Sequence, residues 1–257
     1  ISNQNKKRNG FMKVAIIGSN SFSGSTFVKY LINKKIKVFG FSRSNEANKL
    51  FTPYKLIKNY KNYFIFTKAD LNKIKDIKKI VNLIKKNKIQ YVLNFAAQGM
   101  VAESWINPEH WYNTNVVSNS ILINKLKDLN IKKYVNFSTP EVYGDTKDLI
   151  SEHDKFMPST PYAVSRAAQD LNLKAYLNTF RFPVVFTRAA NVYGPHQQLY
   201  RIIPKTIIKS LKKETLELHG GGKSIRSFIH IEDVSSALYK ILFDKKNIGH
   251  TYHISTK

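Results

Sequence analysis

Residues 14–24, which read VAIIGSNSFSG, decide the fold. The first four are apolar, a turn rich in glycine and serine follows them at once, and a helix is expected over residues 25–33. Glycine lets the backbone of such a turn come close to a ligand, and the N-terminus of the next helix attracts anions. The stretch therefore predicts a strand, a phosphate-binding turn and a helix, with Gly18, Ser21, Phe22, Ser23 and Gly24 as dinucleotide-binding residues.

The rest of the chain continues the alternation of strands and helices. Short continuous apolar runs predict further strands, and residues 74–86 place their isoleucines at helical spacing. Buried strands that alternate with helices indicate a parallel sheet covered on both faces, and right-handed crossovers then give a doubly wound α/β fold. The other predicted strands are residues 37–41, 63–66, 91–95, 133–137, 183–186 and 251–255, and the other predicted helices are residues 74–86, 115–129 and 162–177.

Composition excludes several classes of protein. With 257 residues, 42% hydrophobic residues and no apolar run near about 20 residues, the chain is neither disordered as a whole nor expected to span a membrane. It has no cysteine, which excludes disulfides and thiolate chemistry and agrees with a cytoplasmic location. The histidines are dispersed, and the closest pair, His250 and His253, would lie on opposite faces of a strand, so no metal site is expected.

The net charge of +25 comes from 42 Lys and Arg against 17 Asp and Glu. Only seven of these cations are arginines, and the lysines are scattered among Asn, Ile, Phe and Tyr, which all have AT-rich codons. We interpret the excess as lysines on solvated faces, because no basic and aromatic motif for nucleic acid accompanies them. A nucleic-acid-binding protein is the alternative. In either case the positive field would attract an anionic substrate.

Loops at the ends of the predicted strands supply further candidate cofactor contacts, because a doubly wound sheet binds its ligand at that edge. After the second strand, Ser42 and Arg43 stand where an acidic residue would bind the ribose of NAD. A hydroxyl and a guanidinium suit a 2′-phosphate, which favours NADP over NAD, although ordinary loop residues are the alternative. The candidates after the third and fourth strands are Asp70, Leu71, Phe95, Ala96 and Ala97.

Reactive side chains are also expected where the fifth strand ends and the next helix begins. Tyr162 and Arg166 are four residues apart and so share one face of that helix, where the cation favours the phenolate. Thr139, at the strand end, could hydrogen-bond the same substrate hydroxyl. Together they could take a proton from a sugar hydroxyl while a nicotinamide removes hydride from the same carbon. A surface tyrosine beside a solvated arginine is the alternative.

Several motifs together carry a resemblance to a known family. In chain order they are residues 18–24, residues 95–97, residues 138–144 (STPEVYG), Tyr162 with its cationic partner, residues 191–195 (NVYGP) and residues 226–233 (RSFIHIED). Over residues 12–257 the chain resembles the extended short-chain dehydrogenase/reductases, the NAD-dependent epimerases and dehydratases. Within them it is most similar to the nucleotide-sugar 4,6-dehydratases of the dTDP-glucose type.

The resemblance implies a domain organisation. A Rossmann domain would occupy residues 12–193, residues 226–255 would return to it, and residues 194–225 would begin a substrate-binding lobe. Residues 1–11 would be a tail outside the family. Because members of the family continue past the last predicted strand, we expect this chain to be a fragment with an incomplete substrate pocket. A homodimer through the helices at 115–129 and 162–177 is also implied.

Roles for single residues follow from the same resemblance. Tyr162, assisted by Thr139, would oxidise C4 of a nucleotide-linked hexose together with the nicotinamide. Glu141 would remove the C5 proton as water leaves C6, and hydride would return to C6 to give a 4-keto-6-deoxy sugar. The residues grouped as substrate-binding are Asn191 and Arg226, which would hold the nucleotide diphosphate, and Asn115, which would support the active site from its helix.

Three positions depart from the family pattern. Arg166 replaces a lysine, and because the planar guanidinium reaches ribose hydroxyls differently, activity could be reduced or lost. Pro140 replaces the aspartate that protonates the leaving hydroxyl in dTDP-glucose enzymes; GDP-mannose enzymes also lack this aspartate and keep the glutamate, so the departure bears on the substrate more than on dehydration. Ser21 replaces a glycine of the phosphate loop, which is tolerable where φ is negative.

Three other functions remain open. A nucleotide-sugar epimerase would use the same scaffold, but 4-epimerases generally lack a carboxylate at the position of Glu141. A decarboxylase of the family has that carboxylate and is harder to separate from a dehydratase. A non-catalytic homologue that binds the cofactor is the third alternative, motivated by Arg166.

Overall fold

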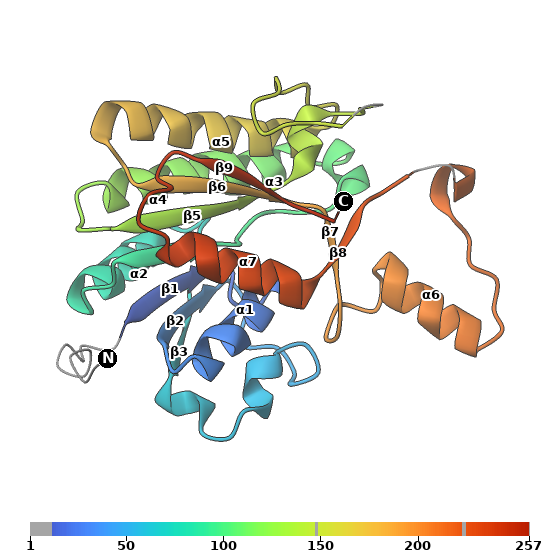
Figure 1. The fold of residues 1–257 in the computed structure, drawn as a ribbon, viewed down its shortest axis with the longest axis horizontal. Coiled ribbons are helices and arrows are strands. Elements are labelled where there is room, and N and C mark those ends of the chain that lie inside the picture. The colour runs from blue at the N-terminus through green and yellow to red at the C-terminus, as the bar shows by residue number, and fades with distance from the viewer. Residues whose placement is uncertain (1–11, 147–148, 223–224, 257) are drawn as a thin grey trace, which may run out of the picture.

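The chain folds around a seven-stranded parallel sheet of order β3-β2-β1-β4-β5-β6-β9, seen in a computed structural model that describes residues 12–146, 149–222 and 225–256 (Figure 1). The predicted tail, residues 1–11, lies outside these residues. The doubly wound α/β prediction is confirmed. The strands are β1 (Lys13–Ile17), β2 (Lys37–Ser42), β3 (Phe64–Lys68), β4 (Tyr91–Asn94), β5 (Lys133–Ser138), β6 (Val184–Ala189) and β9 (Thr251–Ile254).

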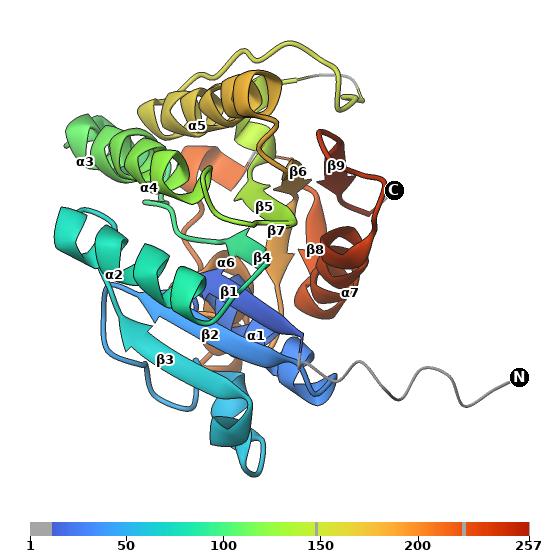
Figure 2. The same cartoon turned by 90° about the vertical axis from the view of Figure 1, so that its left-hand side faces the viewer.

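Helices cover both faces of the sheet (Figure 2). Side chains alternate along each strand, so Val14 and Ile16 of β1 pack into one apolar cluster and Ala15 and Ile17 pack into another. The first cluster takes residues from α1 and α7, and the second takes residues from α2, α4 and α5. The helices are α1 (Phe22–Asn33), α2 (Ile74–Lys86), α3 (Pro108–Tyr112), α4 (Asn119–Leu126), α5 (Pro161–Phe180) and α7 (Ile231–Phe243).

Three helices differ in extent from their predictions. The helix predicted over 162–177, α5, begins one residue earlier and ends three residues later. The helix predicted over 25–33 begins at Phe22, because the side chain of Ser21 caps it there. The helix predicted over 115–129 is the later part of a longer element: α3 continues into a π-helical stretch, η5 (Asn113–Ser118), and then into α4, which ends at Leu126. The buried Trp111 extends the apolar face of this element ahead of the predicted start.

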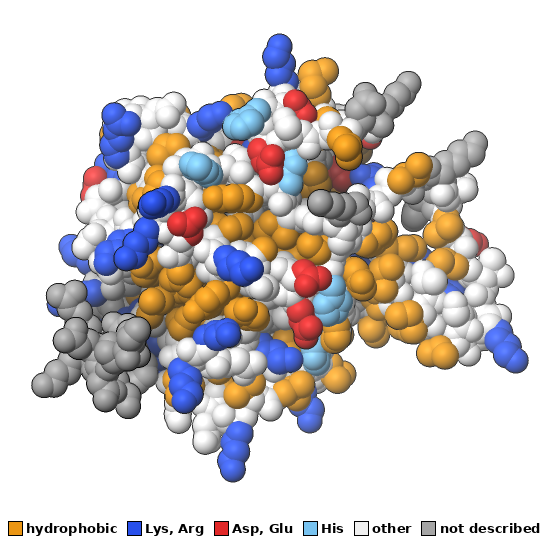
Figure 3. Space-filling model, in the orientation of Figure 1, with side chains coloured by type: hydrophobic (Ala, Val, Ile, Leu, Met, Phe, Trp, Pro, Cys, Tyr) orange, Lys and Arg blue, Asp and Glu red, His pale blue; other side chains and the backbone are white. Residues whose placement is uncertain are grey.

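A smaller unit lies beside the carboxyl ends of the strands. It contains β7 (Asn191–Tyr193), which pairs in parallel with β8 (Phe228–His230), and α6 (Ile202–Leu211), which stands away from the sheet in Figure 1. None of the residues of α6 is buried. Figure 3 shows hydrophobic side chains gathered on this side, and Ile207 and Leu211 are among the exposed ones.

Four short 3-10 helices lie in the connections, among them η6, which follows β5. They are η2 (Pro53–Leu56), η3 (Tyr60–Asn62), η4 (Ala102–Trp105) and η6 (Pro140–Tyr143), and a further one, η7 (His219–Gly222), follows α6. Among the residues described, no helix combines the length and the apolar character that a bilayer span requires.

Candidate active site

The turn after β1 has the geometry of a phosphate cradle. Gly18 has a φ of +85°, and a Cβ added to it would lie 2.7 Å from the backbone nitrogen of Ala96. A Cβ on Gly24 would lie 2.3 Å from the Gly18 carbonyl oxygen. Both positions therefore require glycine for close backbone approach. Ser21 has a φ of −68°, so this departure from the family pattern is tolerated without strain.

Ser21 also builds the cradle. Its hydroxyl donates to the Gly18 carbonyl at 2.8 Å and accepts from the Gly24 N–H at 3.0 Å, which holds the turn against the start of α1. The first turn of α1 contains no acidic residue, so its positive end is not neutralised locally. The cradle therefore fits the pyrophosphate of a dinucleotide.

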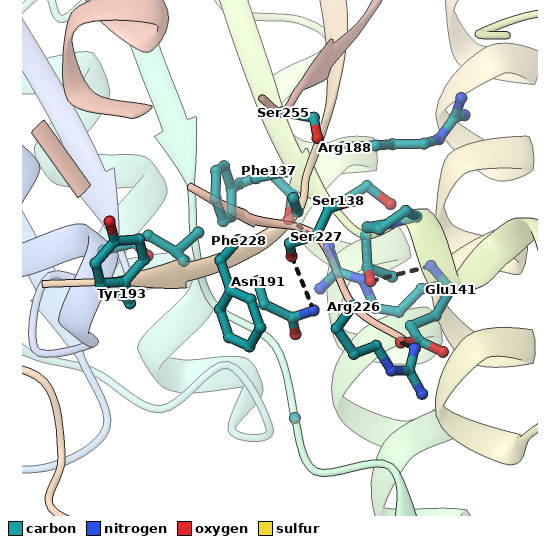
Figure 4. Close-up of a pocket in the computed structure, with 18 of the residues that line it drawn as sticks. Phe137, Ser138, Glu141, Arg188, Asn191, Tyr193, Arg226, Ser227, Phe228 and Ser255 are labelled. Atoms are coloured by element: carbon teal, nitrogen blue, oxygen red, sulfur yellow. Dashed lines mark hydrogen bonds and ion pairs between the residues drawn. The ribbon is translucent and has the colours of Figure 1, made fainter. Parts of the chain in front are cut away.

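A large cavity of about 980 Å³ opens in front of this turn, at the carboxyl ends of the strands. Among the predicted cofactor residues, Ser21, Phe22, Ser23, Arg43, Phe95 and Ala97 line it. The catalytic candidates Thr139, Glu141, Tyr162 and Arg166 and the substrate candidates Asn191 and Arg226 also line it. The structure thus gathers residues from most of the chain around one space, part of which is shown in Figure 4.

The region expected to receive the ribose and adenine lies beside a second cavity of about 490 Å³. Arg43 lines both cavities, and Leu71 lines the smaller one. Ser42 accepts the backbone N–H of Asn20 at 2.9 Å and so supports the turn. Asp70 lines neither cavity, and its carboxylate accepts the N–H of Asn72 at 3.0 Å, so it shapes the turn after β3; its contact with the cofactor stays a prediction.

The short helix η6 presents Glu141 to the large cavity. Thr139 caps this helix, and its hydroxyl accepts the backbone N–H of Glu141 at 3.3 Å. Pro140 occupies the first helical position, where no N–H is needed, so a proline in place of the family's aspartate suits the local backbone. In the sequence STPE, Thr139 therefore caps the helix, Pro140 fixes its first turn, and together they place the carboxylate of Glu141 at the cavity.

Helix α5 carries the tyrosine and the arginine. Thr160 caps the helix and Pro161 starts it, so that Tyr162 lies in the first turn at the cavity. Arg166 is 3% exposed, and its guanidinium donates to the Phe137 carbonyl at the end of β5. The predicted pair therefore shares one face of α5, and the cation is fixed between α5 and β5.

Asn115 supports the site from behind. Its side chain is fully buried, accepts the Gln98 N–H at 2.8 Å and donates to the Gln98 carbonyl at 3.1 Å and to the Ser165 hydroxyl at 2.9 Å. Ser165 in turn donates to the Tyr162 carbonyl at 2.7 Å. Asn115 thus holds a cavity loop and the start of α5, which agrees with the expected support of the active site from its helix; its grouping with the substrate-binding residues stays a prediction.

The opposite wall of the cavity comes from the smaller unit. Asn191 begins β7 and donates to the Ser227 carbonyl at 3.2 Å, which fixes the segment that carries Arg226. Arg226 Nη1 lies 2.9 Å from Glu141 Oε1, and Figure 4 shows the two side chains pointing toward each other. The candidate base and the candidate phosphate ligand therefore form an ion pair with each other.

Sequence reasoning missed Tyr143, Arg188 and His253, which also line the cavity. They come from η6, β6 and β9, and no spacing in the sequence connects them. They are joined to the buried Asp170. Burial raises the pKa of this carboxyl, and the cations of Arg188 and Arg166 offset only part of that rise. Only the folded sheet, in which β9 pairs with β6 and places His253 beside Arg188, brings them together.

Comparison with known proteins agrees with the family resemblance that the sequence motifs carry. Residues 14–255 match the family described as "NAD dependent epimerase/dehydratase family". The trifunctional UDP-glucose 4,6-dehydratase/UDP-4-keto-6-deoxy-D-glucose 3,5-epimerase/UDP-4-keto-L-rhamnose-reductase of Arabidopsis thaliana is 31% identical over 242 residues, which cover 85% of this chain and 36% of that protein. The chain thus spans about a third of the length of this curated relative.

Solved structures of both dehydratases and epimerases are similar. The dTDP-glucose 4,6-dehydratase DesIV of Streptomyces venezuelae, with NAD and TYD bound, has a TM-score of 0.84 and 26% identity, with 95% of this chain and 75% of that chain covered. The UDP-glucuronic acid 4-epimerase of Bacillus cereus, in complex with UDP-glucuronic acid and NAD, has a TM-score of 0.83 and 25% identity, with 96% and 78% covered.

Proposed function

The chain belongs to the NAD dependent epimerase/dehydratase family, and from this premise we propose that it acts as a nucleotide-sugar 4,6-dehydratase. The substrate would be dTDP-glucose or a related nucleotide-linked hexose, and the product a 4-keto-6-deoxy sugar. The observation that carries the proposal is the position of Glu141, a carboxylate that shares one cavity with Tyr162 and Thr139. A 4-epimerase needs no carboxylate at this place.

Each side chain has a task that its position allows. A bound nicotinamide supplies the acceptor and the donor of hydride. Tyr162 takes the proton of the C4 hydroxyl, and Thr139, at the end of β5, orients that hydroxyl. The 4-keto group acidifies the C5 proton, which Glu141 removes and passes to the C6 hydroxyl, so that this hydroxyl leaves as water. Hydride then returns from the nicotinamide to C6, and a solvent proton is added at C5. Asn115 holds the start of α5 and so keeps Tyr162 in place.

The other wall would hold the nucleotide diphosphate. Arg226 presents a guanidinium to the cavity, and such a group can hold phosphate by two parallel hydrogen bonds. Asn191 supports the same segment. We extend the proposal to the organisation of the chain: residues 12–193 and 226–255 hold the cofactor, and residues 194–225 begin the lobe that covers the sugar nucleotide.

For the cofactor we propose NADP rather than NAD. The residues at the end of β2 are Ser42 and Arg43, so a guanidinium stands at the edge of both cavities. The solved relatives described above contain NAD, so the choice is specific to this chain. Arg43→Ala should weaken NADP binding roughly tenfold or more and leave NAD binding nearly unchanged. Equal effects on both cofactors, measured by calorimetry, would contradict the assignment.

The activity is tested with dTDP-glucose, UDP-glucose, GDP-mannose and UDP-glucuronic acid in deuterated water. A dehydratase gives a product that has lost one water and carries deuterium at C5. Inversion at C4 without loss of water would indicate an epimerase, and loss of carbon dioxide from the glucuronic acid would indicate a decarboxylase. Bound cofactor without turnover of any of them would indicate the non-catalytic homologue.

Two variants separate the proposed steps. Glu141→Gln should still oxidise the sugar, visible as reduced nicotinamide, but should not release water. Tyr162→Phe should block both steps. Tyr176→Phe, which removes a phenol oxygen at the far end of α5, is the matched control and should behave as the wild type. Water release by the Glu141→Gln variant at the wild-type rate would refute the role of the carboxylate.

We also propose a homodimer and a cytoplasmic location. Val117 of η5 and Val164 and Leu171 of α5 are 50%, 38% and 56% exposed, so the two predicted helices offer apolar side chains to a second copy. Sedimentation at micromolar concentration tests the dimer, and Leu171→Glu should convert it to a monomer.

A further inference from the structure

A chain of hydrogen bonds joins the core of the protein to the cavity wall. Arg188 Nη2 donates to the Asp170 carboxylate at 3.0 Å, Arg188 Nη1 donates to the Tyr143 hydroxyl at 2.6 Å, and this hydroxyl lies 2.8 Å from His253 Nε2. Asp170, Arg188 and Tyr143 are buried, whereas the ring of His253 is partly exposed and lines the cavity. A buried ion pair is thus connected to a titratable ring that faces the proposed substrate.

The direction of these hydrogen bonds follows from the chemistry of the groups. A guanidinium has donors only, so the Tyr143 oxygen accepts from Arg188. The buried phenol proton then needs an acceptor, and His253 Nε2 is in place to be that acceptor. His253 must therefore be neutral, with its proton on Nδ1. Glu152 Oε1 lies 4.0 Å from Nδ1 and accepts the backbone N–H of His253 at 3.0 Å.

The groups that face His253 come from three other elements. Burial lowers the pKa of His253; Glu152 and Asp154, from the loop between η6 and α5, raise it, and Arg188 of β6 lowers it. Tyr143 of η6 is the fourth titratable neighbour, and burial raises its pKa, against the opposing effect of Arg188. Both directions favour the same state, a protonated phenol that donates to a neutral imidazole.

This series of hydrogen bonds ends on η6, the short helix that carries Glu141. Tyr143 is the last residue of η6 and Glu141 the second, and such a short 3-10 helix has few hydrogen bonds of its own. The Thr139 hydroxyl fixes its beginning, and the Gly144 N–H donates to the Glu141 carbonyl at 3.1 Å. The side chain of Tyr143 fixes its end.

We propose that Arg188 and His253 are positioning residues for Glu141, acting through Tyr143, and that Glu141 is correctly placed only while His253 is neutral. The proposal rests on the function proposed for Glu141. It predicts that the proton on neutral His253 is on Nδ1, which long-range ¹H–¹⁵N NMR spectra show directly. A proton on Nε2 would overturn the proposal, whatever the enzyme does with nucleotide sugars.

Amide exchange at Gly144 measures the order of η6 without turnover. Tyr143→Phe removes the hydroxyl and keeps the ring, and it should speed this exchange roughly fivefold. Tyr176→Phe is the matched control and should not change it. His253→Gln places an amide oxygen near the position of Nε2 and should keep exchange slow, whereas His253→Ala should not. Unchanged exchange in Tyr143→Phe, or equal effects of the two His253 variants, would refute the positioning role.

Turnover gives the second test. Tyr143→Phe and His253→Ala should lower kcat for water release roughly 10- to 100-fold and leave KM nearly unchanged, because they displace the base and not the diphosphate site. In the wild type kcat should fall as the pH drops through the titration of His253, and in His253→Gln this fall should disappear. An unchanged acid limb in His253→Gln would overturn the proposal. If the wild type converts no nucleotide sugar, the proposed function fails, and the exchange and tautomer measurements still decide the positioning chain.

Discussion

Replacing Glu141 with glutamine should strengthen the binding of a nucleoside diphosphate. The Glu141 carboxylate and the Arg226 guanidinium lie 2.9 Å apart, and the proposed function assigns this guanidinium to the diphosphate. A diphosphate that binds Arg226 competes with the carboxylate for this guanidinium and is repelled by its charge, so binding is weakened by about what the ion pair contributes. Glutamine keeps the size of the side chain and removes its charge, which lowers that cost. Loss of the base thus improves binding, although it abolishes water release.

The size of the effect follows from exposure. The side chains of Arg226 and Glu141 are 49% and 24% exposed, and ion pairs in such solvated surroundings contribute roughly 0.2–1 kcal/mol. The Kd for UDP or dTDP should therefore fall roughly 1.5- to 5-fold. The gain should shrink as salt is added, because salt screens the pair that is lost.

Calorimetric titration with UDP and with dTDP at two ionic strengths measures the change. Glu232→Gln is the matched control, since it removes one negative charge from a side chain of α7 that is 79% exposed. The reasoning is refuted if Glu141→Gln binds the nucleotide no better than the wild type, or if Glu232→Gln gains as much. Absence of any binding by the wild type would instead refute the proposed function.

Three further predictions concern stability and its pH dependence. Gly18→Ala forces a side chain onto a φ of +85° and against Ala96, so it should lower the free energy of unfolding by roughly 1–3 kcal/mol in urea titrations and weaken dinucleotide binding. Lys133→Met removes the donor to the Asp244 carbonyl and to Asn247 Oδ1, whereas the Ile241 carbonyl keeps a donor in Asn247 Nδ2; leaving the first two acceptors unpaired should cost roughly 1–3 kcal/mol. Burial lowers the pKa of His253, so the native state binds fewer protons than the unfolded state, and stability should fall as the pH drops from 6.5 through the native pKa; His253→Gln should flatten this fall.

Most of the fold could be predicted because its signals are local. The strands of the sheet contain short apolar runs, such as residues 14–17 in β1, and α2 shows the helical spacing of Ile77, Ile80 and Ile84 so clearly that both of its predicted ends agree with the structure. The start of α1 was missed by three residues, although Ser21 followed by Gly24 carries the capping signal. The π-helical stretch at η5, where the buried side chain of Asn115 holds Gln98 and Ser165 far along the chain, has no such local signal.

The residues of the candidate site also fall into two groups, those that could be predicted from the sequence and those that could not. Residues that follow a strand directly, such as Thr139 and Phe95, could be placed at the cavity because all parallel strands end at one edge of the sheet. Asp70 also follows a strand, but its side chain turns back to its own loop, a choice that local hydrogen bonding makes. The Glu141–Arg226 pair and the Tyr143–His253 contact join residues 85 and 110 positions apart, and no spacing rule reaches that far.

The arginines and the lysines of the chain lie in different places relative to the large cavity. Of the seven arginines, five line the large cavity: Arg43, Arg166, Arg188, Arg201 and Arg226. None of the lysines within residues 12–146, 149–222 and 225–256 does, and those of α2 all face solvent. A solvated lysine can take the place of a solvated arginine at little cost, whereas a planar guanidinium that donates to fixed partners has no such substitute. Most of the lysine excess therefore lies on solvated faces, with the buried Lys133 as an exception, whereas Arg166 and Arg188 are buried and donate to fixed partners. Arg201, which no motif singled out, lines the same cavity as Arg226 at the start of α6, where its side chain is exposed.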